Sequence, residues 1–290
     1  MMKFALFIGC NIPARVQHYE LSARAVLDKL SVDIIDIREF NCCGYPIRNA
    51  DSKAFLLFSA RNLALAEKRS LNIMTLCKCC FGSLKKADHL IKEDSSVRDE
   101  INAILAKEGL VYNGSIEVKH FLSVLHKDIG LETINKKIIR SFKDLKVAAH
   151  YGCHALRPSD VMQFDNPVAP VLFDQLLEVT GAKSIEWPLK LECCGAPLLG
   201  VNDDLSMDLT EKKLAAGIQS GADYLCTACP WCQLQFDSVQ KIINIKRGSN
   251  HLLPSIVFPQ ILGIAMGMNA KDLGVDMNQI DIRGFEGFLT

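Results

Sequence analysis

Two adjacent cysteines occur twice in the chain, each time followed by glycine and, two residues later, by proline. The two segments read Asn41-Cys42-Cys43-Gly44-Tyr45-Pro46 and Glu192-Cys193-Cys194-Gly195-Ala196-Pro197. Each pair has a single cysteine upstream and a cluster downstream, which is Cys77-Lys78-Cys79-Cys80 in the first case and Cys229-Pro230-Trp231-Cys232 in the second. Because thiolates bind iron–sulfur clusters, zinc or Cu(I), these segments predict two metal or redox sites built in the same way.

The spacing of the cysteines is similar in the two halves. In the first half, 31 residues separate the single cysteine from the pair and 33 separate the pair from the cluster; in the second half the numbers are 39 and 34. Each half therefore offers five matched thiols. They are Cys10, Cys42, Cys43, Cys77 and Cys80 in the first half, and Cys153, Cys193, Cys194, Cys229 and Cys232 in the second. Cys79 and Cys226 fall outside this pattern, and packing as small buried side chains is the simpler explanation for them.

The number of thiols bears on the kind of metal. Five thiolates exceed the four of a tetrahedral zinc site, although one of the five could stand aside. Ordinary cubane clusters also use four cysteines, commonly in closely spaced runs. Ligands that come from three separate places, with a neighbouring pair among them, favour an unusual iron–sulfur cluster in which one iron is held differently from the rest. Zinc in one half stays open as the alternative.

Composition sets limits on the partners and the compartment. The chain has 290 residues, 49% of them hydrophobic and 23% charged, which is typical of a soluble globular protein. Lys+Arg and Asp+Glu both total 33, so no net field attracts nucleic acid or an anionic membrane. The apolar run in Met1–Gly9 is too short for a signal peptide, and Ile256–Met268 is shorter than the roughly 20 residues of a membrane helix. We therefore expect a cytoplasmic protein without membrane insertion or a nucleic-acid partner, whose 12 cysteines do not form a disulfide scaffold.

The elements that must position the cysteines follow a βαβαβ pattern in each half. The predicted strands cover residues 3–8, 32–37 and 72–76, then 146–151, 183–187 and 223–225, and each precedes a cysteine. Helices are predicted at 19–30, 54–66, 83–92, 97–108, 120–128 and 131–142, then at 168–180, 204–220 and 229–246. Such units form right-handed parallel sheets whose ligands bind beyond the carboxyl ends of the strands. We predict an α/β fold with two similar domains, each a small parallel sheet with flanking helices and cysteines at the strand carboxyl ends.

The pattern restarts after Asp144-Leu145. The offset between the halves is roughly 150 residues, the scale of a duplicated domain rather than of a solenoid repeat. We therefore predict domains at residues 1–145 and 146–290. The apolar tail from His251 is expected to pack on the second half.

With these motifs, the sequence resembles the B subunit of heterodisulfide reductase, whose family is defined by two cysteine-rich CCG domains. The resemblance covers nearly the whole chain. Besides the two pairs, it lies in Cys10-Asn11-Ile12-Pro13-Ala14-Arg15, in His150-Tyr151-Gly152-Cys153-His154-Ala155-Leu156-Arg157-Pro158-Ser159-Asp160 and in Cys229-Pro230-Trp231-Cys232-Gln233. It implies reduction of a small-molecule disulfide between two noncubane [4Fe-4S] clusters, each held by one of the five-thiol sets. It also implies a ferredoxin-like iron–sulfur subunit and a flavin-containing subunit as partners, because the chain has no Gly-x-Gly-x-x-Gly fingerprint and no compact ferredoxin cysteine run.

Reduction of a disulfide needs protons as well as two electrons. His154 is a candidate proton donor, because an imidazole titrates near neutral pH; a hydrogen bond to cluster sulfur or backbone is the other role open to it. Arg15 and Arg157 follow the single cysteines at similar distances, and they could bind anionic groups of the substrate or offset cluster charge. Ordinary ion pairing is the competing interpretation for both. Lys78 is a weaker candidate of the same kind.

Two other functions stay open. One is an electron-relay subunit of a quinone- or hydroxy acid-linked oxidoreductase, as in other CCG-containing proteins. Those proteins often carry fused ferredoxin segments, so the lack of such a segment favours a disulfide reductase, running in either direction. The other is a zinc-bearing scaffold subunit without catalytic activity.

Overall fold

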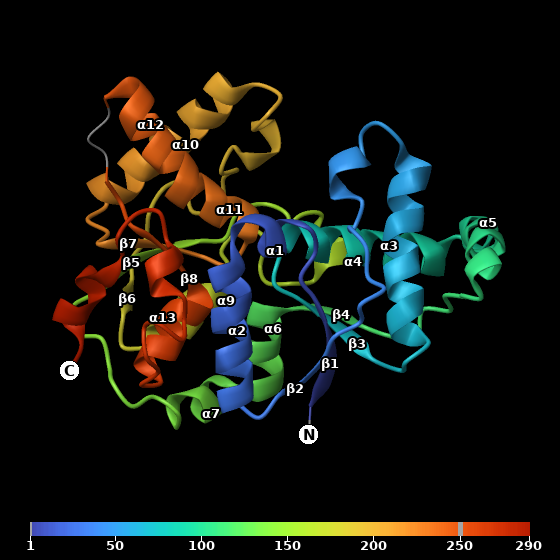
Figure 1. Ribbon diagram of the computed structural model, residues 1–290, viewed down its shortest axis with the longest axis horizontal. Helices are drawn as coiled ribbons and strands as arrows, with labels where there is room; N and C mark the ends of the chain where they lie inside the picture. The colour runs from blue at the N-terminus through green and yellow to red at the C-terminus, as the bar shows by residue number, and fades with distance from the viewer. Residues whose placement is uncertain (1, 249–251) are drawn as a thin grey trace.

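The computed structural model describes residues 2–248 and 252–290, and within them the chain forms two parallel four-stranded sheets, one from each half (Figure 1). The strand order is β2-β1-β3-β4 in the first sheet and β6-β5-β7-β8 in the second. The strands are β1 Lys3–Phe7, β2 Asp33–Ile35, β3 Asn72–Thr75, β4 Val118–His120, β5 Lys146–His150, β6 Lys183–Ser184, β7 Tyr224–Thr227 and β8 Ser255–Val257. Because the two orders are equivalent, the predicted α/β fold with two similar domains is confirmed.

Helices connect and cover the strands. In the first half they are α1 Asn11–Arg15, α2 Gln17–Lys29, α3 Ser52–Glu67, α4 Lys78–Glu93, α5 Ser95–Leu105, α6 Phe121–Ser123 and α7 Leu131–Asn135. In the second half they are α8 Ser159–Met162, α9 Leu172–Glu178, α10 Asp203–Gln219, α11 Pro230–Leu234, α12 Gln240–Arg247 and α13 Phe258–Ala265. The side chains of Asp51 and Asn202 cap α3 and α10 by accepting hydrogen bonds from backbone N–H groups. These capped helices follow the two cysteine pairs at the same distance.

The central strands bring equivalent residues to the same edge of each sheet. β1 pairs in parallel with β3, so that Phe7 lies opposite Thr75; β5 pairs with β7, so that His150 lies opposite Thr227. Apart from the first residue of each, β1 and β5 are buried along their length, as expected for a parallel strand covered on both faces. The segments that follow these strands therefore leave the two sheets at matching positions.

Several predicted helices are shorter or begin later than expected. The helix predicted at 120–128 begins one residue later, at Phe121, and continues to Ile129. His120 instead ends the edge strand β4, which pairs with β3 and which we did not predict, because three residues are too few to reveal a periodicity. The helix predicted at 131–142 ends with α7, after which the backbone N–H groups of Ile139 and Arg140 donate to the Ala265 carbonyl. The helix predicted at 168–180 begins only at Leu172, because the side chains of Asp165 and Asn166 accept the preceding N–H groups and hold that segment in a turn.

The tail joins the two halves. We expected it to pack on the second half, and it does not pack there alone. β8 extends the second sheet, but α13 packs against α2 of the first half (Figure 1). Every residue of α13 is buried, so this helix needs neighbours on all sides. His251, where the predicted tail begins, lies outside the described residues, and the boundaries 1–145 and 146–290 stay a prediction. Across the part of the chain that the structure describes, no helix is both long and apolar enough to cross a membrane.

Candidate metal centre

The strand ends bring each five-thiol set together. In the first half, the thiols contact one another in the order Cys10, Cys42, Cys43, Cys80, Cys77. In the second half, the order is Cys153, Cys193, Cys194, Cys232, Cys229. The two series are equivalent position by position, and they meet where Cys77 contacts Cys229. The sets predicted from spacing therefore lie end to end across the junction of the two halves.

The glycine after each pair is required by the backbone. Gly44 and Gly195 have φ angles of 83° and 92°, in the left-handed region that side chains other than glycine avoid. A Cβ atom would also lie 3.0 Å from the Phe55 carbonyl oxygen at Gly44 and 2.6 Å from that of Ser206 at Gly195. Each glycine thus turns the chain sharply against the following helix, α3 or α10, and this turn directs the adjacent thiols toward the other cysteines.

The same helices hold the backbone of each pair. The Ser59 hydroxyl of α3 donates to the carbonyl oxygen of Cys43 over 2.7 Å, and the Thr210 hydroxyl of α10 donates to that of Cys194 over 3.0 Å. Both hydroxyls are buried, so these hydrogen bonds satisfy groups that water does not reach. The side chain that orients the pair is thus also equivalent in the two halves.

Hydrogen bonding between the thiols lowers the pKa of one cysteine in each pair. Hydrogen bonds with Cys10 and Cys43 lower the pKa of Cys42 to about 2, and the bond between Cys42 and Cys10 raises the pKa of Cys10 well above its usual value. In the second half, hydrogen bonds from Cys153 and Cys194 lower the pKa of Cys193 to about 2. Each set therefore contains a thiolate at neutral pH, which is the form that binds metal, and metal binding releases the remaining protons.

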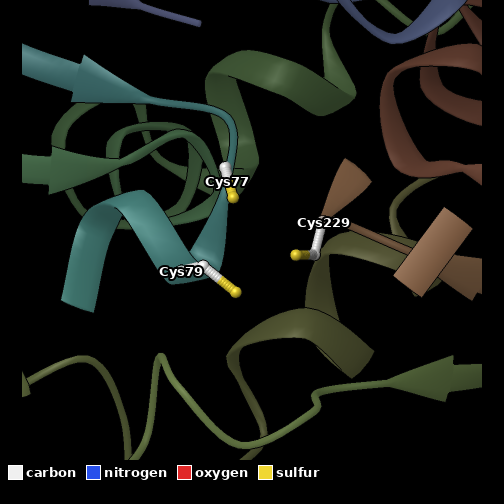
Figure 2. Close-up of side chains that lie close together, drawn as sticks. All are labelled: Cys77, Cys79 and Cys229. Atoms are coloured by element: carbon white, nitrogen blue, oxygen red, sulfur yellow. The ribbon is translucent and has the colours of Figure 1, made fainter. Parts of the chain in front are cut away.

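Cys79 joins the site, although its spacing placed it outside the pattern. The sulfur atoms of Cys77, Cys79 and Cys229 lie within 4.8 Å of one another, and Figure 2 shows the three side chains converging from the start of α4 and from the segment after β7. Its only signal in the sequence was a third thiol in the cluster Cys77-Lys78-Cys79-Cys80. Since the contact to Cys229 depends on how the halves pack, spacing alone could not reveal it. Cys226 is buried within β7.

Lys78 connects the two halves at the same point. Its Nζ atom donates to the carbonyl oxygens of His150, over 3.0 Å, and Tyr151, over 2.7 Å. The side chain is only 2% exposed, and Nζ lies 5.2 Å from the centre of the Phe173 ring. Burial lowers the pKa of Lys78, while the neighbouring thiols of the second set act to raise it. The equivalent residue in the second half is Pro230, which has no donor to return the contact.

Open space lies beside the second set far more than beside the first. A cavity of about 250 Å³ is lined by all five thiols of the second set and by Cys79, whereas the space against the first set is about 10 Å³. A further cavity of about 510 Å³ adjoins the one of about 250 Å³, and they share Tyr45, Arg48, Asn49, Cys79 and His154. A small molecule can therefore approach the thiols from the side of the second set.

His154 stands between the two cavities. Its Nδ1 atom lies 3.3 Å from the sulfur of Cys79, and its Nε2 atom lies 3.2 Å from the Tyr45 hydroxyl and 3.3 Å from Nη1 of Arg48. Burial lowers the pKa of His154 below its usual value, and the positive charge of Arg48 lowers it further. The imidazole therefore contacts both a thiol and two hydrogen-bonding groups that face the cavity.

The predicted arginines are in different places. Arg157 lines the cavity of about 510 Å³, together with Arg48, Lys53 and Lys86. Arg15 is exposed at the end of α1 and lines none of the cavities described above. Sequence reasoning missed Arg48, which follows the first cysteine pair by five residues and could have been noticed as a cation close to the Cys43-Gly44 turn.

The residues present fit a metal cofactor. All five thiols of each set converge, and soft thiolate donors suit iron–sulfur clusters or zinc. The fully buried imidazole of His150 also lies within 4.8 Å of the sulfurs of Cys194 and Cys232, and neither of its ring nitrogens has a hydrogen-bond partner among the described residues. Other buried polar atoms of the described residues also lack a partner, but His150 is the one side chain among them with two such atoms, and its place beside two thiols supports a further group here.

Comparison with known proteins agrees with the duplicated architecture. Residues 4–85 and 147–237 each match the cysteine-rich domain family named CCG. The chain is thus a protein of two CCG domains with a thiol set in each. It belongs to the family of heterodisulfide reductase B subunits, which confirms the resemblance found in the sequence.

The relatives differ in their names. The chain is 37% identical to the B subunit of the ferredoxin/F(420)H(2)-dependent CoB-CoM heterodisulfide reductase of Methanosarcina acetivorans, over 97% of this chain and 94% of that protein. It is 32% identical to the 8-methylmenaquinol:fumarate reductase membrane anchor subunit of Wolinella succinogenes, over 96% of this chain and 97% of that protein. A solved structure of a hypothetical protein from Helicobacter pylori is similar with a TM-score of 0.75 at 23% identity; it covers 97% of this chain, which spans about half (52%) of the Helicobacter chain. That likeness supports the fold alone.

Proposed function

We propose that this chain is the disulfide-reducing iron–sulfur subunit of a heterodisulfide reductase-like complex. The observation that carries the proposal is the meeting of two equivalent five-thiol sets at Cys77 and Cys229, next to a cavity that can admit a small molecule. A duplicated set suits a two-electron reaction, because one electron can come from each side of the junction.

The cofactors we propose are two noncubane [4Fe-4S] clusters, one on each set. The thiols from Cys10 to Cys80 would hold the first and those from Cys153 to Cys232 the second, with Cys79 and Cys226 outside both ligand sets. Five ligands per set, including an adjacent pair, support a cluster that differs from the cubane type. When bound, the clusters would supply the electrons of the reaction.

The substrate would lie in the joined cavities with its disulfide near Cys79 and His154. The reaction RS–SR′ + 2e⁻ + 2H⁺ → RSH + R′SH breaks one S–S bond and needs two protons. The Nδ1 and Nε2 atoms of His154 face the thiol and the cavity, so this side chain is placed to pass a proton to a departing sulfur. Arg48 and Arg157 would attract an anionic arm of the substrate. Arg15 was predicted for the same role and stays an untested prediction, although it lies away from these cavities.

The electrons must come from partner subunits in this proposal. A ferredoxin-like iron–sulfur subunit, itself fed by a flavin-containing subunit, fits the relatives that are named as the B subunits of reductases. Cys10 is exposed and Cys42 is half-buried, so the first set offers an edge where such a partner could approach. We place this complex in the cytoplasm.

A second candidate function is electron relay without disulfide chemistry. The Wolinella relative favours it, because that protein is named as a subunit of a quinol:fumarate reductase. In a relay, both sets would carry electrons, and the cavity would not need to bind a disulfide.

The test begins with the metal. Anaerobically purified protein should contain about eight iron atoms per chain and give electron paramagnetic resonance signals unlike those of cubane clusters. With a reduced dye as electron source, it should release two thiols from each molecule of a small disulfide. About four irons or fewer together with zinc would contradict the two-cluster proposal and support a scaffold role. Two clusters without thiol release would support the relay.

A further inference from the structure

His150 is a buried imidazole that has no hydrogen-bond partner in the described part of the chain. It ends β5, its side chain is fully buried, and both ring nitrogens lack a hydrogen-bond partner among the described residues. One of its nitrogens lies within 4.8 Å of the sulfur atoms of Cys194 and Cys232. An imidazole always carries at least one N–H group, and burying such a donor without an acceptor costs about 1–3 kcal/mol. The position therefore indicates that an acceptor comes with the metal centre.

The neighbours of His150 other than the thiols offer no acceptor for this N–H group. The ring contacts Phe236 edge-on, with 5.0 Å between the ring centres, and this neighbour accepts no conventional hydrogen bond. The indole N–H of Trp187 is already used by the Ala149 carbonyl, and Lys213 donates to the Leu189 carbonyl. At Gly152, a Cβ atom would lie 3.4 Å from Nε2 of His150 and 3.9 Å from the sulfur of Cys232. Nε2 and the Cys232 sulfur thus both border the Gly152 backbone.

The first half has no imidazole at the equivalent position, although the side-chain N–H group of Asn11 in that half is also buried without a partner among the described residues. The residue equivalent to His150 is Phe7, because each ends the central strand of its sheet and lies opposite a threonine in the neighbouring strand. Phe7 is fully buried and packs edge-on against Phe40. The two sets have the same order of thiol contacts, yet only the second has an imidazole beside them.

We propose that His150 donates a hydrogen bond to a sulfur atom of the second metal centre and raises its reduction potential above that of the first. This inference rests on the clusters of the proposed function. A hydrogen bond to cluster sulfur stabilises the extra negative charge of the reduced state, so it favours reduction. Since five thiols are already present, the imidazole is a donor and not a sixth ligand. Electrons that enter at the first set would then move toward the second set, which borders the cavity of about 250 Å³.

The experiment is a redox titration of the iron-loaded protein followed by electron paramagnetic resonance. His150→Phe copies the first half, and we expect it to disfavour one-electron reduction of the second centre about tenfold, which is ~59 mV. His150→Gln keeps an N–H donor and should retain most of the wild-type potential. Phe7→His should shift the other centre upward. The matched control is His18→Phe, a buried histidine on α2 that neither lines the cavities beside the thiols nor belongs to their groups.

The iron content separates failure of this inference from failure of the proposed function. If the wild-type protein lacks two clusters, the proposed function fails. If it has both clusters but His150→Phe leaves both potentials unchanged, the inference is wrong. Loss of iron from both His150 variants, with an intact His18→Phe control, would make His150 a ligand and would also overturn the hydrogen-bond proposal. The signal of the second centre is identified as the one that Cys194→Ser removes.

Discussion

The two halves of the molecule hold their thiols in the same way but surround them differently. The thiols of both sets contact one another in the same order, and each set has one cysteine with a strongly lowered pKa. In each half, a glycine turn follows the cysteine pair, and a helix hydroxyl donates to the backbone of the pair. Around this shared frame, many positions differ between the first and the second half, and four of the differences concern hydrogen-bonding or thiol groups near the sets. They are Phe7 and His150, Asn11 and His154, Lys78 and Pro230, and Cys79 and Trp231.

Three of these four differences lie at the cavity of about 250 Å³, and the fourth, between Phe7 and His150, lies in the buried interior. His154 and Trp231 line the cavity of about 250 Å³ beside the second set, and Cys79 of the first half also lines it. In the proposed function, the equivalent parts would hold the metal, and most of the parts that differ would contact the substrate or join the halves. The comparison thus supports two similar centres, of which the second would face the substrate.

The largest effect should come from removing one thiol of either frame. Cys43→Ser and Cys194→Ser should each lower disulfide reduction to background, because the proposed reaction takes one electron from each centre. Each variant should lose the iron and the resonance signal of its own half. Retained turnover in a protein that lacks one cluster would contradict the two-centre reaction. Cys226→Ser is the matched control: it changes a buried cysteine outside both sets, and it should keep both signals.

A smaller effect on turnover should follow when the residue after the single cysteine of the second half is changed to its counterpart in the first half. His154→Asn copies Asn11 of the first half, and it removes a side chain that contacts Cys79, Tyr45 and Arg48. If His154 supplies a proton, kcat should fall by about 10² or more while both clusters stay loaded. The measurement is steady-state turnover beside iron content. Full turnover with intact clusters would remove the proton donor role and leave His154 as a structural contact.

Much of this arrangement could be predicted from local sequence. The strands that end at Cys10, Cys77 and Cys153 are continuous apolar segments, and the repeated cysteine pairs are enough to identify the two sets. The edge strands β4 and β8 could not be predicted in this way, because three residues carry no period and their pairing is decided by the neighbouring strand.

The contacts between the two halves could not be predicted from local sequence for a different reason. The approach of Cys79 to Cys229, the packing of α13 on α2 and the reach of Lys78 across the junction all depend on how two sheets pack. One signal was available and was missed: when the segments Lys3–Phe7 and Lys146–His150 are aligned, phenylalanine and histidine occupy the same position.

The smallest of the three effects concerns Lys78, which has no lysine counterpart in the second half. The prediction tests whether its hydrogen bonds to the second half stabilise the junction. Lys78→Met keeps an unbranched apolar stem but leaves the carbonyl oxygens of His150 and Tyr151 without their donor. Unsatisfied buried acceptors cost about 1–3 kcal/mol, although removal of a buried charge offsets part of that cost. We therefore expect a thermal midpoint lowered by several degrees in anaerobic unfolding of the loaded protein, roughly 2–4 °C for each kcal/mol. Lys86→Met on the same helix changes an exposed lysine and should shift the midpoint far less. An equal shift in the two variants would show that the contact of Lys78 does not stabilise the junction.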